Sequence, residues 1–92
     1  MMHLKKNKMV TVKKFSASWC GPCRALAPVM NEVKTQFSNV LFEDIDVDES
    51  SDIASKYNIR SVPTLVMKDG NIEMKRMVGM KSKQDLAEWL NG

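Results

Sequence analysis

Two cysteines separated by two residues, Cys20 and Cys23, lie between a segment typical of a β-strand and a segment typical of an α-helix. Residues 9–16 are rich in β-branched and apolar side chains, which favour a strand. After the cysteines, Pro22 fits the first turn of a helix that we expect to end near residues 38–39. Apolar residues recur along this helix at spacings of three and four: Leu26, Val29, Met30, Val33 and Phe37.

The rest of the chain continues this alternation. Residues 40–46 predict a second strand, and Ser50 or Ser51 would cap a short helix that follows it. Residues 64–67 and 72–78 predict two further strands, joined by a tight turn at Asp69-Gly70. A last helix would begin at a capping box and turn its apolar side inward; the residues concerned are Ser82, Asp85, Leu86, Trp89 and Leu90.

The order of predicted elements is βαβαββα, which indicates an α/β fold. A strand, a helix and a second strand build a parallel pair whose connecting helix packs on the sheet. We therefore expect a four-stranded mixed sheet with helices on both faces. The 92 residues suffice for a single domain, which we place at residues 9–92, after a short, basic and frayed N-terminal segment at residues 1–8.

Composition narrows the classes of function. With 43% hydrophobic and 27% charged residues, the chain has the balance of a soluble protein. It contains no run of about 18 apolar residues that could span a membrane. The basic beginning, MMHLKKNK, is not followed by the apolar stretch of a secretory signal, so we expect a cytoplasmic protein.

The charges and metal-ligand residues also limit the possible partners. The net charge of +3 is scattered along the chain, so we expect no binding of nucleic acid. We also expect a monomer that does not bind membranes. A structural zinc site usually takes four Cys and His ligands. The chain offers two cysteines and the single histidine His3, so we expect no metal site.

The placement of the two cysteines at a helix start gives them unequal chemistry. The unpaired N–H groups and the positive end of the helix dipole would stabilise a thiolate at Cys20. In such motifs the pKa of the thiol falls from near 8.5 to about 3.5–7.5. We expect Cys20 to be exposed and to attack a disulfide, and Cys23, one turn inward, to resolve the mixed disulfide. A Cys-x-x-Cys pair can also be half of a metal site or two buried cysteines, but its position between strand and helix favours redox chemistry.

Four segments resemble the thioredoxin family: FSASWCGPCRALAP at 15–28, DVD at 46–48, YNIRSVPTLVMKDG at 57–70 and VG at 78–79. The resemblance extends from about residue 9 onward and implies a thioredoxin-like fold. It implies a thiol–disulfide oxidoreductase that reduces protein disulfides, with Cys20 as nucleophile and Cys23 as resolving thiol. Re-reduction would come from an NADPH-dependent thioredoxin reductase, and no cofactor would be bound beyond the redox-active disulfide Cys20–Cys23.

The resemblance also assigns a substrate-binding surface. Pro63 matches a proline that the family holds in the cis form facing the disulfide, where it would present the backbone of Val62 to an extended substrate segment. The alternative is an ordinary proline at a strand edge. An apolar rim around the sulfurs would come from Trp19, Gly21, Pro22, Gly79 and Met80, with Pro22 also tuning the cysteines. For Trp19 the alternative is simple core packing.

The chain departs from the family at its beginning and at Lys14. Full-length members start with a further strand and helix, so this chain looks like a minimal version, closer in outline to glutaredoxins. Where Lys14 stands, the family normally carries a buried Asp. Its bacterial members often place a Lys on the neighbouring strand, at the position that matches Asp44. Because an unpaired buried charge is costly, we expect Lys14 and Asp44 to form a pair with the signs exchanged and to tune the cysteines. The alternative is that Lys14 extends to solvent.

The sequence is also compatible with two other functions. The short architecture is compatible with a glutaredoxin-like enzyme that draws electrons from glutathione, although WCGPC lacks a Tyr after the proline. The chain could also be a binding module whose rim docks one partner while the cysteines play no redox part. Replacing Cys20 and Cys23 by serine separates these classes, since a pure binder would keep its function.

Overall fold

A computed structural model describes residues 10–92, and within this part of the chain the predicted order of elements is confirmed. The predicted frayed segment at residues 1–8 lies outside the described residues. In chain order the elements are β1 (Val10–Ser16), α2 (Gly21–Val33), the 3₁₀-helix η1 (Lys34–Gln36), β2 (Val40–Asp46), α3 (Ser51–Lys56), β3 (Thr64–Asp69), β4 (Ile72–Val78) and α4 (Lys83–Asn91).

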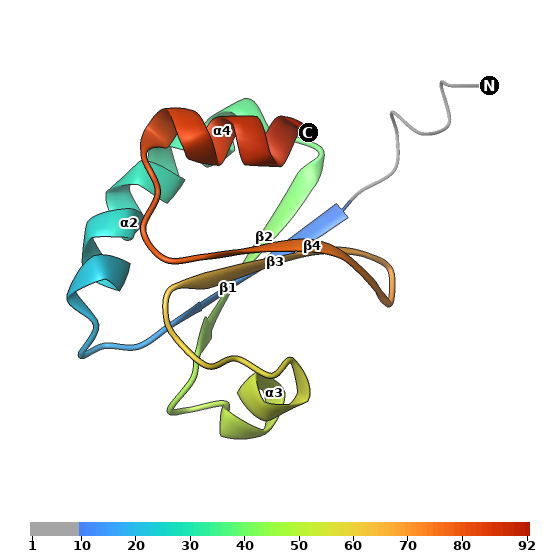
Figure 1. Ribbon diagram of the computed structural model, residues 1–92. Helices are drawn as coiled ribbons and strands as arrows, with labels where there is room; N and C mark the ends of the chain where they lie inside the picture. Colours follow the sequence, from blue (N-terminus) through green and yellow to red (C-terminus); the bar gives the residue numbers. More distant parts are fainter. Residues whose placement is uncertain (1–9) are drawn as a thin grey trace.

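The strands form a four-stranded sheet in the order β2-β1-β3-β4. Strand β1 pairs in parallel with β2 and antiparallel with β3, and β3 pairs antiparallel with β4. Helices α2 and α4 lie on one face of this sheet and α3 lies on the other (Figure 1). The predicted mixed sheet with helices on both faces is therefore confirmed.

Each face of the sheet has its own hydrophobic cluster, because side chains alternate along a strand. Val12 of β1 points into the larger cluster, beneath α2 and α4, and Phe15 points into the smaller one, beneath α3. The larger cluster has nine buried members: Val12, Leu26, Met30, Val33, Leu65, Met67, Met77, Leu86 and Leu90. The smaller has three: Phe15, Ile45 and Val66. Helix α2, which begins at the cysteines, is thus fixed on the larger core.

The end of the first helix and the β3–β4 turn differ in detail from the prediction. The first helix leaves α-geometry after Val33 and continues only as the 3₁₀ turn η1, a common way to tighten a helix end. Strand β3 extends to Asp69, which pairs with Ile72, so the turn is Gly70-Asn71. Of the turn residues only Gly70 has a positive φ, +63°, the pattern that a type II′ turn requires.

The serine caps differ between the two later helices. Ser82 caps α4 as predicted, since its side chain accepts the Asp85 N–H at 3.1 Å. Ser50 stands at the start of α3, but its side chain makes no capping hydrogen bond. Among the helices between residues 10 and 92, none has the length and apolar character needed to cross a membrane.

Candidate active site

The two cysteines lie at the N-terminus of α2 and form a disulfide with their Cα atoms 5.2 Å apart. Cys20 is the N-cap residue, and the backbone N–H of Cys23 donates to Cys20 Sγ over 3.1 Å. Pro22, within the first turn, has no N–H group that could compete for the sulfur. The helix start therefore directs a hydrogen-bond donor, and the positive end of its dipole, at Cys20 Sγ.

Burial does not distinguish the two cysteines. In this oxidised form Cys20 is 4% exposed and Cys23 is 5% exposed, so the expectation of an exposed Cys20 is wrong. The reason is local packing, because Ala17 is buried against the pair and the partly buried Val47 and Val62 cover it. The N-cap hydrogen bond, which only Cys20 Sγ accepts, distinguishes the two sulfurs.

The loop before β3 approaches the disulfide through its backbone. The Val62-Pro63 bond is cis, as predicted, and the carbonyl oxygen of Val62 lies 3.7 Å from Cys20 Sγ. Pro63 is fully buried, which excludes an ordinary proline at a strand edge. The N–H of Gly79, at φ +91°, donates to the Pro63 carbonyl at 2.8 Å and ties the end of β4 to this loop.

Trp19 is exposed beside the cysteines. Its exposed fraction of 66% rules out core packing as its only role. Its indole Nε1–H donates to Asp48 Oδ2 at 2.8 Å, a contact that sequence reasoning missed, although the DVD segment at 46–48 was the available signal. Trp19 and Val62 also line a pocket of about 140 Å³, together with Val47, Ile59, Arg60 and Ser61.

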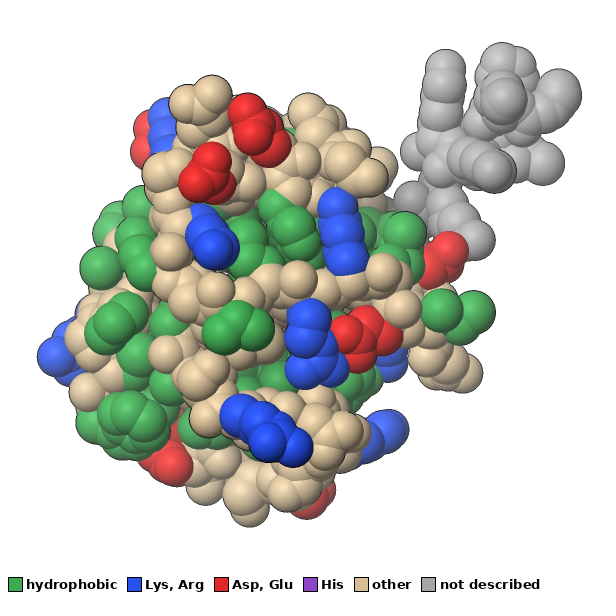
Figure 2. Space-filling model, in the orientation of Figure 1, with side chains coloured by type: hydrophobic (Ala, Val, Ile, Leu, Met, Phe, Trp, Pro, Cys, Tyr) green, Lys and Arg blue, Asp and Glu red, His purple; other side chains and the backbone are tan. Residues whose placement is uncertain are grey.

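Three other residues of the predicted rim are exposed. Gly21 and Pro22 are exposed at the start of α2, and Met80 is exposed directly after Gly79. On the face seen in Figure 2, hydrophobic side chains gather over the side where β1 leads into α2. These three residues of the predicted rim therefore lie at the surface, at the start of α2 and directly after β4.

Lys14 and Asp44 stand opposite each other in the parallel pairing of β1 with β2. Lys14 Nζ lies 3.4 Å from Asp44 Oδ1, so the two side chains form an ion pair. The Lys14 side chain is 12% exposed and that of Asp44 is 75% exposed. The lysine stem is thus largely buried while the carboxylate stays in water, which weakens the pair by screening.

The described residues offer no obvious metal centre. Between residues 10 and 92, no three His, Cys, Asp or Glu side chains gather closely enough to hold a metal ion. The chemistry that the site can perform with its own residues is the exchange of electrons between a dithiol and a disulfide.

Comparisons with known proteins agree with this geometry. The family model described as thioredoxin matches residues 2–92. A thioredoxin from Mycoplasma genitalium is 38% identical over 87 residues, covering 95% of this chain and 82% of that protein. A thioredoxin from Chlamydia pneumoniae is 42% identical over 78 residues, covering 84% of this chain and 76% of that protein.

Plant proteins give similar matches. Thioredoxin H2 from Arabidopsis thaliana is 37% identical over 81 residues, which cover 88% of this chain but only 61% of that protein. The chain therefore spans less than two thirds of some relatives. The crystal structure of a thioredoxin from Nicotiana alata superimposes with a TM-score of 0.85 at 33% identity, covering 98% of this chain and 80% of that one.

Proposed function

Because this chain belongs to the thioredoxin family, we propose that it is a thiol–disulfide oxidoreductase that reduces protein disulfides through Cys20 and Cys23. The observation that carries the proposal is the N-cap hydrogen bond from the Cys23 N–H to Cys20 Sγ at 3.1 Å. A sulfur that accepts this bond at a helix N-terminus is stabilised as a thiolate. Cys20 is therefore the attacking group and Cys23 the resolving group.

The reaction proceeds in two exchanges. In the reduced protein, the Cys20 thiolate attacks one sulfur of a substrate disulfide, so a Cys20–substrate bond forms and the other substrate sulfur leaves as a thiolate that takes up a proton. Cys23 then loses its proton and attacks Cys20 Sγ, which releases the second substrate thiol. The product is the Cys20–Cys23 disulfide, and two electrons have passed to the substrate.

The surroundings of the disulfide support a binding role for the predicted rim. The Val62 carbonyl beside Cys20 Sγ can accept a backbone N–H of an extended substrate segment, as in strand addition. Apolar contacts on either side would hold the flanking side chains. We assign this substrate-binding role to Trp19, Gly21, Val62, Pro63, Gly79 and Met80.

Three residues are proposed to tune the redox properties of the cysteines. Lys14 adds a positive charge on the sheet face that α2 covers, and Asp44 neutralises part of it. Pro22 leaves the N-cap interaction to the Cys23 N–H, because it lacks a donor of its own.

We further propose that an NADPH-dependent thioredoxin reductase restores the dithiol and that the protein works as a cytoplasmic monomer without a bound cofactor. An insulin-reduction assay tests the donor when it is run once with thioredoxin reductase and NADPH and once with glutathione, glutathione reductase and NADPH. Turnover only in the second assay would favour the glutaredoxin-like alternative. Turnover in neither, with partner binding kept in a Cys20→Ser/Cys23→Ser variant, would favour a binding module.

Alkylation of the reduced protein tests the roles of the two cysteines. We expect iodoacetamide to modify Cys20 much faster than Cys23 at neutral pH, because only Cys20 Sγ accepts the N-cap hydrogen bond. Mass spectrometry of timed samples gives both rates, and equal rates would contradict the assignment. As a second readout, Cys23→Ser should accumulate a mixed disulfide with substrate, whereas Cys20→Ser should not.

A further inference from the structure

A second pocket, with a volume of about 380 Å³, lies between the end of α3 and the β3–β4 hairpin. Its lining is mainly basic and polar and includes Lys56, Tyr57, Asn58, Lys68, Asn71 and Arg76; we call it the basic pocket. Glu73 is the single acidic residue of the lining. Figure 2 shows Lys and Arg side chains on the surface between β4 and α3.

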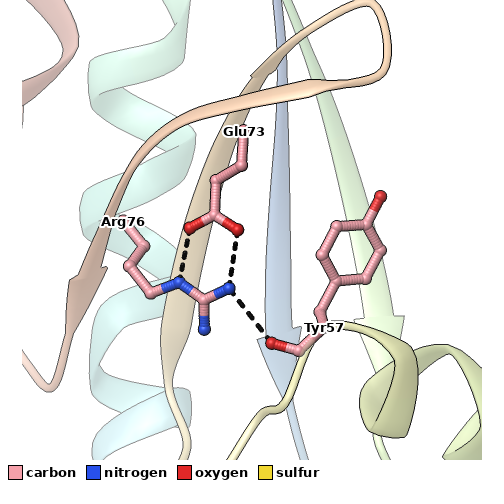
Figure 3. A network of polar contacts seen from close by, with 3 residues as sticks. All are labelled: Tyr57, Glu73 and Arg76. Carbon is pink, nitrogen blue, oxygen red and sulfur yellow. Dashed lines mark hydrogen bonds and ion pairs between the residues drawn. The ribbon is translucent and has the colours of Figure 1, made fainter.

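Arg76 and Glu73 neutralise each other within the basic pocket. Arg76 donates through Nε and Nη2 to the two carboxylate oxygens of Glu73 at 2.6 and 2.7 Å, and Nη2 also donates to the Tyr57 carbonyl at 3.0 Å (Figure 3). The hydrogen bonds that Arg76 donates to the Glu73 carboxylate hold the pKa of Glu73 below its usual value and raise the pKa of Arg76. Arg76 therefore acts as a clamp between β4 and the end of α3. Its positive charge is balanced by the Glu73 carboxylate.

Lys56 and Lys68 form no ion pair with a described carboxylate, although the charge of Lys68 also contributes to the lowered pKa of Glu73. Lys68 donates to the Tyr57 hydroxyl, and its Nζ lies 5.0 Å from the centre of that ring. Lys56 Nζ lies 6.0 Å from the same ring. Among residues 10–92, no carboxylate lies within ion-pair distance of either lysine. An ammonium group carries three donors, so the basic pocket has spare N–H groups and an excess of positive charge.

The position of the basic pocket links it to the cysteines. The connection from α3 to β3 begins with Tyr57 and Asn58 in the basic pocket, and it ends with Val62, whose carbonyl lies beside Cys20 Sγ. Between them, Ile59 and Arg60 line the smaller pocket that also contains Trp19. One short segment therefore joins the apolar rim to the basic pocket.

We propose that the basic pocket binds a carboxylate side chain of the substrate protein, carried on the segment that flanks the disulfide to be reduced. A carboxylate fits because it only accepts hydrogen bonds, whereas Lys56, Lys68 and the Tyr57 hydroxyl have hydrogens to donate. The inference rests on the proposed reductase function and adds the class of substrate, namely disulfides with an acidic neighbour.

Single-turnover kinetics with peptides test this proposal. The reduced full chain is mixed with peptides whose one cysteine is joined by a disulfide to a chromophoric aryl thiol. Single Glu residues are moved outward from the cysteine, and each peptide has a matched Gln peptide. We expect Glu at one position to raise the second-order rate constant about threefold to fivefold over Gln, the effect of a partly screened charge pair, and added salt to remove the gain.

Two pocket variants and a control locate the effect. Lys56→Glu and Lys68→Met should each lower the Glu-to-Gln rate ratio toward one. Lys34→Glu, the same charge change on an exposed residue of η1, should leave the ratio as it is.

The outcomes separate the two proposals. A ratio of one at every position, or a ratio unchanged by both pocket variants, overturns the basic pocket as a substrate site. Failure of the wild type to reduce even the Gln peptides overturns the reductase function itself. A preference that Lys56→Glu and Lys68→Met abolish while Lys34→Glu keeps it supports the inference.

Discussion

The two faces of the sheet hold their helices by different kinds of contact. On the face that carries α2 and α4, nine buried apolar residues form one cluster. On the face that carries α3, the cluster has three buried members, Phe15, Ile45 and Val66, and the hydrogen bond from Arg76 to the Tyr57 carbonyl adds a polar contact at the end of α3. The helix that carries the cysteines thus rests on apolar packing. The loop that approaches them from the other side, residues 57–63, begins at a helix end held by a smaller apolar cluster together with the hydrogen bond from Arg76 to the Tyr57 carbonyl.

This difference suggests that the two faces have different roles. Apolar packing carries no charge that pH could titrate or that salt could screen, so it suits the helix that must keep the N-cap hydrogen bond on Cys20. Hydrogen bonds to charged groups respond to both and are easily rearranged. Changes on the face with α3 can therefore alter substrate recognition without disturbing the packing of the helix that carries the cysteines.

The largest expected effect comes from breaking the apolar face. Leu86 is 0% exposed, and Leu86→Ala should lower the free energy of unfolding by about 3 kcal/mol through lost burial and a cavity. Ile53→Ala, at a partly buried residue of the α3 face, should cost only about 1 kcal/mol. Urea unfolding followed by circular dichroism measures both. Equal losses would mean that the two faces contribute alike.

A smaller effect comes from releasing the polar clamp. Arg76→Met removes the hydrogen bonds to Glu73 and to the Tyr57 carbonyl, so we expect a loss of about 1–2 kcal/mol. Hydrogen exchange should quicken at the amides of α3 and not at those of α2. Lys83→Met, which breaks an exposed ion pair with Glu32 on the other face, is the control and should cost at most about 1 kcal/mol. Exchange that quickens equally in both helices would contradict a local clamp.

Lys14 tests the comparison of the two sheet faces in another way, because it places a charge on the face that carries α2 and α4. We expect Lys14→Met to keep the fold, to lower the fraction of Cys20 present as thiolate at neutral pH, and to slow turnover about twofold to fivefold, since a positive charge is lost. The effect stays small because the exposed Asp44 already screens the ammonium.

Ultraviolet titration of the thiolate in wild type and variant decides this point. Lys13→Met, which breaks the pair with Glu43, is the control from the neighbouring position of β1 and should titrate like the wild type. Superimposable curves and equal rates for Lys14→Met would show that its charge does not reach the sulfurs.

The smallest effect is the pH dependence of the clamp. Since Arg76 lowers the pKa of Glu73 in the folded state, the clamp contributes stability at pH values above the unfolded pKa, and this contribution disappears as the pH falls through the folded pKa. The stability advantage of the wild type over Glu73→Gln should therefore be present at neutral pH and shrink in acid. Thermal unfolding of both proteins across this range measures it. An advantage that is independent of pH would assign Glu73 a packing role only.

The sequence predicted those features that are encoded by local pattern. Cys20, Pro22 and Cys23 define a helix start by themselves. Runs rich in β-branched and apolar residues, with a turn signal between the last two, were enough to locate the four strands, although β3 extends to Asp69. Pro63 was predicted to be cis by its resemblance, and the bond is cis.

Contacts between segments far apart in the chain could not be predicted in the same way. The hydrogen bond from Trp19 to Asp48 and the clamp from Arg76 to Tyr57 depend on how side chains meet across the fold. The near-equal burial of Cys20 and Cys23 depends on Val47 and Val62, which come from two other segments. The propensity of a segment to form a helix or a strand carries no information on such contacts between distant segments.

The short span of the disulfide has a thermodynamic consequence. Cys20 and Cys23 are separated by only 3 positions, so their bond closes a very small loop and restricts the unfolded chain little. In the chain-entropy model such a loop accounts for about 2 kcal/mol, against about 4.7 kcal/mol for a loop of 100 residues. Opening the bond thus removes little conformational restraint from the rest of the molecule. The protein can store and release an electron pair many times while its folding equilibrium shifts much less than it would with a disulfide that closes a long loop.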